Sequence, residues 1–261
     1  MSSRKTAIVT GSNSGIGLAI AEALAGSGSN IVLNSFTDSE ADHKLAADLA
    51  KKHSVECAYI KADMAKPAEC RDLVAQAVAK FGSVDILVNN AGIQHVSPVE
   101  SFPTDKWDAI IAINLSSAFH TTAVAVPLMK KAGWGRIVNI ASAHGLRASP
   151  NKSAYVAAKH GVVGLTKTVA LETAGSGVTS NAVCPGFVHT PLVEIQIKDR
   201  MKEHPGMDRD AVVCDIILEK QPSKQFATVD QIAGAVLYLC SDVAAQVTGT
   251  TISVDGGWTA S

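Results

Sequence analysis

Short apolar runs rich in β-branched residues alternate with amphipathic helical patterns along all 261 residues. This alternation constrains the fold strongly, because parallel strands need a crossover connection between them and that connection is usually a helix. Seven runs are expected to be strands, at 6–10, 30–33, 57–61, 86–89, 136–140, 179–183 and 251–254. Helical spacing of apolar residues marks stretches such as 18–25, 68–81, 105–131 and 155–174. The pattern predicts an α/β fold with a doubly wound, seven-stranded parallel sheet and helices on both faces.

No linker rich in Pro, Gly or Ser divides the chain, so a single domain over 1–261 is expected. One segment, 191–226, interrupts the alternation: it is charge-rich, and His204-Pro205-Gly206 separates two short helical patterns. A solvated surface insertion is one interpretation. A mobile, closing lid is the other, because the segment follows a strand end, where α/β sheets place their ligand crevice.

Composition narrows the class of protein. Hydrophobic residues make up 47% and charged residues 18%, which is globular, and the net charge of −1 argues against nucleic acid as a partner. The N-terminus does not resemble a signal peptide, and no run of about 18 consecutive apolar residues suggests a membrane span. A cytoplasmic protein without a membrane partner is expected. Five dispersed cysteines with no zinc-type spacing predict reduced thiols that fill the core, and no metal site.

A glycine-rich loop, Thr10-Gly-Ser-Asn-Ser-Gly-Ile-Gly17, connects the first expected strand to the first helix. Glycines allow positive φ and close approach of the backbone to a phosphate, and the helix N-terminus offers free N–H groups and a positive dipole. A plain turn is the alternative, but a strand before and a helix after favour a Rossmann-type dinucleotide site. The residues expected to hold the cofactor here are Gly11, Ser12, Asn13, Gly15, Ile16 and Gly17.

The Gly-x-x-x-Gly-x-Gly spacing of this loop resembles the short-chain dehydrogenase family rather than the general Gly-x-Gly-x-x-Gly fingerprint. The turn Asn89-Asn-Ala-Gly92, the pair Asp63-Met64 and the segment Pro185-Gly-Phe-Val-His-Thr190 match that family in order and separation. The resemblance implies cofactor contacts at Asp63, Met64, Asn90, Ala91, Gly92, Pro185, Gly186, Val188 and Thr190.

The end of the second strand, Asn34-Ser-Phe-Thr-Asp38, indicates which nicotinamide cofactor is used. An adenosine 2′-phosphate needs an Arg or Lys here, and none is near. The sequence therefore favours NAD over NADP, with Phe36 beside the adenosine. The acidic residue usual at this strand tip is also missing, and Ser35 stands where the resemblance suggests Gly.

Tyr155 and Lys159 lie four positions apart in the sequence, which places both on one face of a helix. A tyrosine ordinarily titrates near pH ~10, and a neighbouring ammonium is expected to lower its pKa and make it a usable base. Ser142, at the end of the fifth strand, can stabilise the substrate oxygen. An exposed helix pair is the alternative for Tyr155 and Lys159. The resemblance adds Asn114 as the holder of a water near Lys159, completing an Asn–Ser–Tyr–Lys tetrad.

Three polar side chains, Gln94, His144 and Lys152, are expected at the same crevice, with Lys152 about one turn from Tyr155 if the helix begins early. A cation beside neutral donors suits a small carboxylate, although each residue alone has an ordinary structural explanation. The stretches 142–146, 149–161 and 184–197 resemble family members that oxidise (R)-3-hydroxybutyrate to acetoacetate with NAD. That resemblance implies Gln196 and Trp258 as further substrate contacts, together with Tyr155 and Ser142.

Two other functions fit part of the pattern. A reductase of 3-ketoacyl or acetoacetyl-CoA substrates would prefer NADPH and a basic entry surface, and neither feature is evident. A non-catalytic regulator that senses dinucleotides would keep the fold but lack the Tyr155–Lys159 pair. The family resemblance and the apolar helices 105–131 and 155–174 predict a homotetramer.

Overall fold

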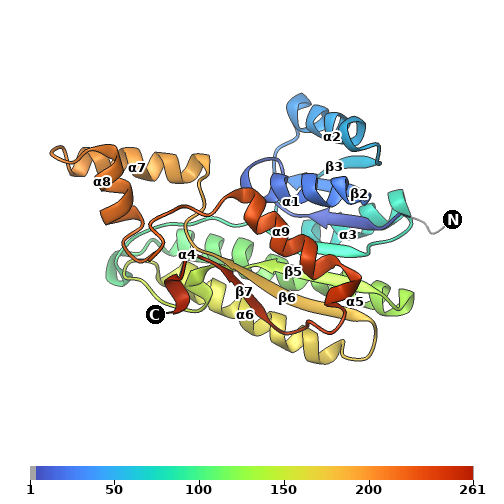
Figure 1. Ribbon diagram of the computed structural model, residues 1–261. Coiled ribbons are helices and arrows are strands. Elements are labelled where there is room, and N and C mark those ends of the chain that lie inside the picture. The colour runs from blue at the N-terminus through green and yellow to red at the C-terminus, as the bar shows by residue number, and fades with distance from the viewer. Residues whose placement is uncertain (1–3, 261) are drawn as a thin grey trace.

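A seven-stranded parallel sheet forms the centre of the computed structural model, which describes residues 4–260 except the side chains at 191 and 192 (Figure 1). Its strands are β1 (Thr6–Val9), β2 (Asn30–Ser35), β3 (Cys57–Lys61), β4 (Ile86–Asn89), β5 (Gly135–Ile140), β6 (Val178–Pro185) and β7 (Thr251–Val254). The strand order is β3-β2-β1-β4-β5-β6-β7. Each expected strand lies within about a residue or two of its expected place, and the doubly wound fold is confirmed.

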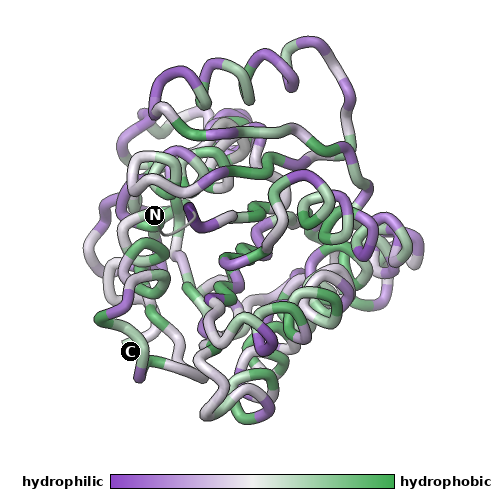
Figure 2. Tube along the Cα trace, turned by 90° about the vertical axis from the view of Figure 1, so that its right-hand side faces the viewer, coloured by the Kyte–Doolittle hydropathy of each residue, from purple (hydrophilic) through white to green (hydrophobic). Residues whose placement is uncertain are grey.

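Helices cover both faces of this sheet. The longer ones are α1 (Gly15–Gly26), α2 (Glu40–His53), α3 (Pro67–Phe81), α4 (Thr104–Ile111), α5 (Ser117–Ala132), α6 (Ser153–Glu172), α7 (Pro191–Glu203) and α9 (Val229–Cys240); α8 is the single turn Arg209–Ala211. Helices α1, α2 and α9 share one apolar core with the sheet, and α3 and α5 share the other. In Figure 2 the outermost helix, α2, is largely hydrophilic, because only its inner side packs on the sheet.

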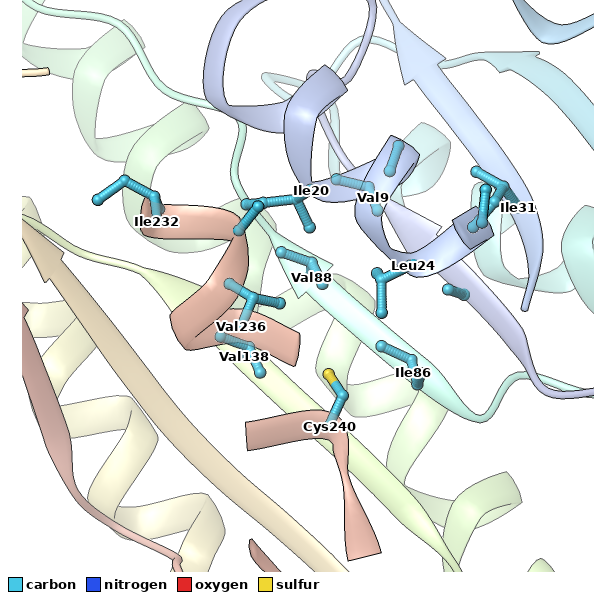
Figure 3. Close-up of a cluster of buried hydrophobic side chains, with 14 of the residues drawn as sticks. Val9, Ile20, Leu24, Ile31, Ile86, Val88, Val138, Ile232, Val236 and Cys240 are labelled. Atoms are coloured by element: carbon cyan, nitrogen blue, oxygen red, sulfur yellow. The ribbon is translucent and has the colours of Figure 1, made fainter. Parts of the chain in front are cut away.

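The inner strands are buried along their whole length because both of their faces are covered. In β1, Ala7 and Val9 belong to one core while Ile8 belongs to the other, and all three are fully buried. Figure 3 shows Val9 packed in the first core among side chains of α1 and α9, including Leu24 and Val236. Continuous burial of this kind is typical of parallel sheets.

The expected helix over 105–131 is present as one helical stretch, Thr104–Ala132, but it is not regular throughout. A π-helical turn, Ala112–Ser116, separates α4 from α5. Such turns widen one helical step and are frequent at functional sites, and this one contains Asn114. The combined stretch Thr104–Ala132 is long and apolar enough to cross a membrane by composition. Here α5 packs on α3, β4 and β5, as a core helix does.

The charge-rich segment 191–226 projects from the sheet as α7, α8 and a π-helical turn, Val212–Ile217 (Figure 1). It has a small apolar core of its own, built from Val193, Ile197, Val213, Ile217 and Leu218. Its return to the sheet is tied down by Lys224, whose ammonium donates to three carbonyl oxygens at the end of that turn. The charged residues therefore lie over an apolar interior.

Candidate active site

A single cavity of about 670 Å³ lies at the carboxyl ends of the strands, beneath α7. Residues that follow each of the seven strands line it, from Gly11 after β1 to Trp258 after β7. Of the residues expected from sequence, the following line it: Gly11, Asn13, Gly15, Ile16, Gly17, Phe36, Asp63, Met64, Asn90, Ala91, Gly92, Gln94, Ser142, His144, Lys152, Tyr155, Lys159, Pro185, Gly186, Val188, Thr190, Gln196 and Trp258. Ser12 and Asn114 do not line it; they bind the lining residues Asn34 and Ile93 from behind.

The glycine-rich loop forms a tight cradle at the start of α1. A Cβ atom on Gly17 would lie 2.4 Å from the carbonyl oxygen of Gly11 and 2.5 Å from Nδ2 of Asn90, so only glycine fits. Gly11 has φ of +59°, which glycine adopts without strain. Asn90 Nδ2 donates to the carbonyl oxygens of Thr10 and Gly11, both at 2.9 Å. This close backbone approach and the helix N-terminus fit a dinucleotide pyrophosphate.

Asn34 is a support for the cradle that sequence reasoning missed. Its side chain is fully buried, accepts from Gly11 N at 3.2 Å and donates to the carbonyl oxygens of Ile60 and Ala62. Ser12 is buried too, and its hydroxyl donates to Val9 O and accepts from Asn34 N. Ser12 was marked by the glycine-rich loop, whereas the only sequence signal for Asn34 was an uncharged polar residue near the end of an apolar strand. Both residues hold the loop in shape from the inside.

The far end of the cavity, formed by Phe36, Asp63 and Met64, offers no cation. Among the described lining residues the only ones with positive charge are Lys159, which lies beside Tyr155, and Lys152. Behind Asn13, the carboxylate of Asp42 accepts from Asn13 Nδ2 at 3.0 Å. The backbone N–H of Ser39, and then Asn13, hold the pKa of Asp42 well below its usual range. This end therefore carries negative charge and would repel a phosphate.

Ser142 and Tyr155 meet at the middle of the cavity, from the end of β5 and the first turn of α6. The Ser142 hydroxyl accepts from His144 N at 3.1 Å, which leaves its own proton free to donate. Burial raises the pKa of Tyr155, and hydrogen bonding from Ser142 opposes this. In the protein by itself the loss of hydration dominates, and the lowering of the pKa expected beside Lys159 and the oxidised nicotinamide stays a prediction.

Lys159 is held behind Tyr155. Its ammonium donates to Ile140 O at 2.7 Å and lies 5.6 Å from the centre of the Tyr155 ring. Burial lowers the pKa of Lys159 to about 8. Asn114 accepts from Ile93 N at 2.8 Å and donates to Ile93 O at 2.9 Å. A Cβ atom on Gly92 would lie 3.6 Å from Asn114 Oδ1 and 3.7 Å from Lys159 Nζ, so Gly92 lies beside both groups.

His144, Lys152, Gln94 and Gln196 are brought together at the other end of the cavity, from four separate segments. Helix α6 begins at Ser153, two residues earlier than the expected 155, and Lys152 is its N-cap with a non-helical backbone. Burial, and then Lys220, lower the pKa of Lys152. Burial, and then Lys152, lower the pKa of His144 to about 3, so this imidazole is neutral at physiological pH.

An aromatic wall closes this end. Trp258 stacks on Phe187 with ring centres 5.5 Å apart and packs edge-on against His144 at 4.9 Å. Asp255 holds the turn before Trp258 by accepting from Thr259 N and Gly257 N. Phe187 was not predicted as a site residue, although it lies inside the stretch Pro185–Thr190 that was expected to contact the cofactor. The wall excludes water from one side of the site, which strengthens charge interactions there.

The cysteines and possible metal ligands add no chemistry to this site. All five cysteines are free thiols, and burial raises the pKa of Cys184 to about 11, which keeps it protonated. Across residues 4–260, no group of three His, Cys, Asp or Glu residues is arranged to hold a metal ion.

Known proteins similar to this chain were found by sequence and by structure. A family model described as enoyl-(acyl carrier protein) reductase matches residues 11–259. D-beta-hydroxybutyrate dehydrogenase of Rhizobium meliloti is 57% identical over 98% of this chain and 99% of its own. The enzyme of the same name from Cupriavidus necator is 54% identical, with 98% of each chain covered.

A solved structure of an actinorhodin polyketide ketoreductase variant with NADPH superimposes with a TM-score of 0.89 at 33% identity, covering 98% of this chain and 97% of the other. The family model, the two relatives and the solved structure each match nearly the full length of this chain. The matched region includes the glycine cradle and Ser142, Tyr155 and Lys159. This chain is an oxidoreductase and belongs to the short-chain dehydrogenase/reductase family.

Proposed function

We propose that this protein catalyses the reversible, NAD-dependent oxidation of (R)-3-hydroxybutyrate to acetoacetate. The observation that carries the proposal is the placement of Lys152 beside Tyr155 and Ser142 in one cavity. A proton acceptor, an oxygen-binding hydroxyl and a carboxylate anchor then face the same small volume. Two relatives above 50% identity bear the name of this activity.

Tyr155 and Ser142 perform the proton chemistry in this mechanism. The bound cofactor supplies the hydride acceptor for oxidation and the hydride donor for reduction. Tyr155 Oη takes the proton from the substrate hydroxyl during oxidation and returns it during reduction. Ser142 donates its hydroxyl proton to the same substrate oxygen, which steadies the charge that develops there. Because burial raises the pKa of Tyr155, the positive charges of Lys159 and of the oxidised nicotinamide are needed to favour the phenolate.

Lys159 and Asn114 position this proton transfer. With a pKa of about 8, Lys159 is mostly charged at neutral pH, and its bond to Ile140 O fixes the charge behind Tyr155. Asn114 shapes the backbone at Ile93, next to Gly92 and Lys159. In the proposed mechanism Asn114, within the π turn, holds a water that relays the proton from Lys159 to solvent, as the family resemblance implies.

Lys152, Gln94, His144 and Gln196 hold the substrate carboxylate, and Trp258 limits its methyl end. Lys152 supplies the charge, and the amides and the neutral imidazole supply hydrogen bonds. Gln196 lies on α7, so segment 191–226 acts as a lid of the single domain 1–261 that completes the clamp when it closes over the cavity.

NAD is the preferred cofactor in this proposal. The Phe36 end of the cavity has no cation to pair with an adenosine 2′-phosphate, and Asp42 places negative charge behind Asn13. The dinucleotide contacts are those of the cradle, of Asp63, Met64 and the Asn90–Gly92 turn, and of Pro185, Gly186, Val188 and Thr190.

A cytoplasmic homotetramer is the proposed assembly. Trp107, Phe119 and Leu171 are 39%, 49% and 80% exposed on α4, α5 and α6, so these helices offer apolar side chains for another subunit to cover. Light scattering on the purified protein tests this, and a monomeric 27.1 kDa species would contradict it.

The test of function is NADH formation with NAD or NADP and separate (R)- and (S)-3-hydroxybutyrate. Turnover with NAD and the R enantiomer alone is expected. Oxidation of NADPH by acetoacetyl-CoA with no turnover of 3-hydroxybutyrate would instead favour a ketoacyl reductase, the activity suggested by the ketoreductase that superimposes on this chain. Binding of NADH without turnover of either substrate would favour a dinucleotide-sensing regulator.

A further inference from the structure

A chain of three side chains leads from the base of the 191–226 segment into the cavity. Lys220 Nζ donates to Ser149 Oγ at 3.1 Å, and Ser149 Oγ lies 2.9 Å from His144 Nε2. Lys220 follows the π-helical turn of this segment, Ser149 belongs to the loop before α6, and His144 follows β5. Neither Lys220 nor Ser149 lines the cavity. The contact is therefore a support of His144 from outside.

Charge and hydrogen-bonding capacity together favour one arrangement of the protons. An ammonium only donates, so Lys220 occupies one lone pair of Ser149 Oγ, and the second lone pair and the hydroxyl proton remain available to His144. The Lys220 cation polarises the Ser149 O–H into a stronger donor and disfavours an Nε2–H that points toward it. Nε2 of the neutral imidazole is therefore expected to accept from Ser149. The proton of His144 is left on Nδ1.

We propose that Lys220, acting through Ser149, holds His144 in the Nδ1–H tautomer, so that His144 presents a hydrogen-bond donor to the substrate. Lys220 and Ser149 are positioning residues, because neither touches the cavity. The identity of the substrate rests on the proposed function, whereas the tautomer does not. The opposite tautomer would direct a lone pair of Nδ1 at a carboxylate and repel it.

The surroundings of Lys220 hold it in this role. The next residue, Gln221, is fully buried and accepts from Phe187 N at 3.0 Å, which fixes the chain to the aromatic wall. Lys224 anchors the same turn through three carbonyl oxygens. The edge-on packing of Trp258 fixes the plane of the His144 ring at 4.9 Å. The segment base, the wall and the imidazole thus form one connected unit.

Histidine ¹⁵N spectra test the tautomer without any substrate. Long-range ¹H–¹⁵N correlation on histidine-labelled protein, with His144 assigned from His144→Gln, should show a protonated Nδ1 and an unprotonated Nε2. In Lys220→Met and Ser149→Ala this preference should weaken, and Lys220→Arg should restore it. A protonated Nε2 in the wild type, or an unchanged tautomer in both variants, would overturn the proposal.

Kinetics separate positioning from a general loss of stability. Lys220→Met and Ser149→Ala should raise KM for 3-hydroxybutyrate about tenfold with kcat changed less than about twofold, because one ground-state hydrogen bond is weakened. The matched control is Lys44→Met, an exposed lysine on α2 away from the cavity, which should leave KM unchanged. Equal effects of Lys220→Met and Lys44→Met would overturn the role of Lys220. The expected tautomer in a protein that ignores 3-hydroxybutyrate would overturn only the proposed substrate.

Discussion

The two ends of the cavity are formed by different parts of the residues that line them. The end that fits the dinucleotide is made largely of backbone: Gly17 leaves no room for a Cβ atom, and Asn90 and Asn34 bind main-chain groups of the loop. The end proposed for the substrate is made of side chains, with Lys152 and Gln196 supplied by segments distant in the sequence. One end recognises shape, and the other recognises charge.

This difference explains how one scaffold can serve many substrates. The cradle is held by side chains that lie apart from the substrate end, so a family can retain the cofactor while its substrate end varies. Tyr155 and Lys159 lie between the two ends and serve both. Substitutions at the two ends should therefore fail in different ways, which four experiments can examine.

The largest expected effect is at the junction of the two ends. Tyr155→Phe should lower kcat by about 10²–10⁴-fold, because the proton acceptor is lost. Steady-state assays measure the rate, and NADH fluorescence titration measures cofactor affinity, which should stay within about twofold. Near-normal turnover by this variant would remove Tyr155 from the mechanism.

A smaller but still large effect is expected at the backbone end. Gly17→Ala should weaken NADH binding about 100-fold, because its Cβ atom would displace Gly11 and Asn90 and misplace the cofactor. Gly164→Ala on α6 is the control, since a Cβ atom there meets nothing within 4 Å. If fluorescence titration gave equal affinities for the two variants, the cradle would be wrongly assigned.

At the side-chain end, Lys152→Met should raise KM for 3-hydroxybutyrate about tenfold or more and leave NADH affinity unchanged, because a charged hydrogen bond is lost. The methyl ester of the substrate has no carboxylate, so its KM should not respond. Lys131→Met, at an exposed position of α5, serves as the control. A parallel loss with acid and ester would show that Lys152 acts on folding rather than on charge.

The smallest effect concerns stability, again at the side-chain end. The pKa of His144 is lowered to about 3 in the fold, so below its ordinary value of 6.5 the unfolded chain binds the extra proton. Stability should therefore fall as pH falls from 6.5 toward 3, by about 2 kcal/mol between pH 7 and 5 from this group. Urea unfolding of the wild type and of His144→Gln at pH 7 and pH 5 isolates the contribution of His144 to the free energy of unfolding. If this free energy changed equally with pH in the two proteins, the burial of a neutral imidazole would be contradicted.

Much of the backbone end was predictable from sequence. The strand–helix alternation and the glycine spacing depend on local rules, namely uninterrupted burial in a parallel sheet and the steric demand of a close turn. The division of helix 105–131 at Asn114 was not predictable, because a π turn leaves the apolar periodicity almost unchanged. Asn34 also escaped notice, because its partners on β3 are distant in the sequence.

The sequence by itself determined the doubly wound fold, the dinucleotide cradle and the Tyr155–Lys159 pair, because each follows from spacing within one element or one turn. Only the tertiary structure decided that Tyr155 is buried enough to raise its pKa and that Lys152 precedes its helix. The same holds for the contact of Lys220 with His144 through Ser149. Burial and contacts between distant segments depend on how the whole chain packs, and local sequence rules do not contain that information.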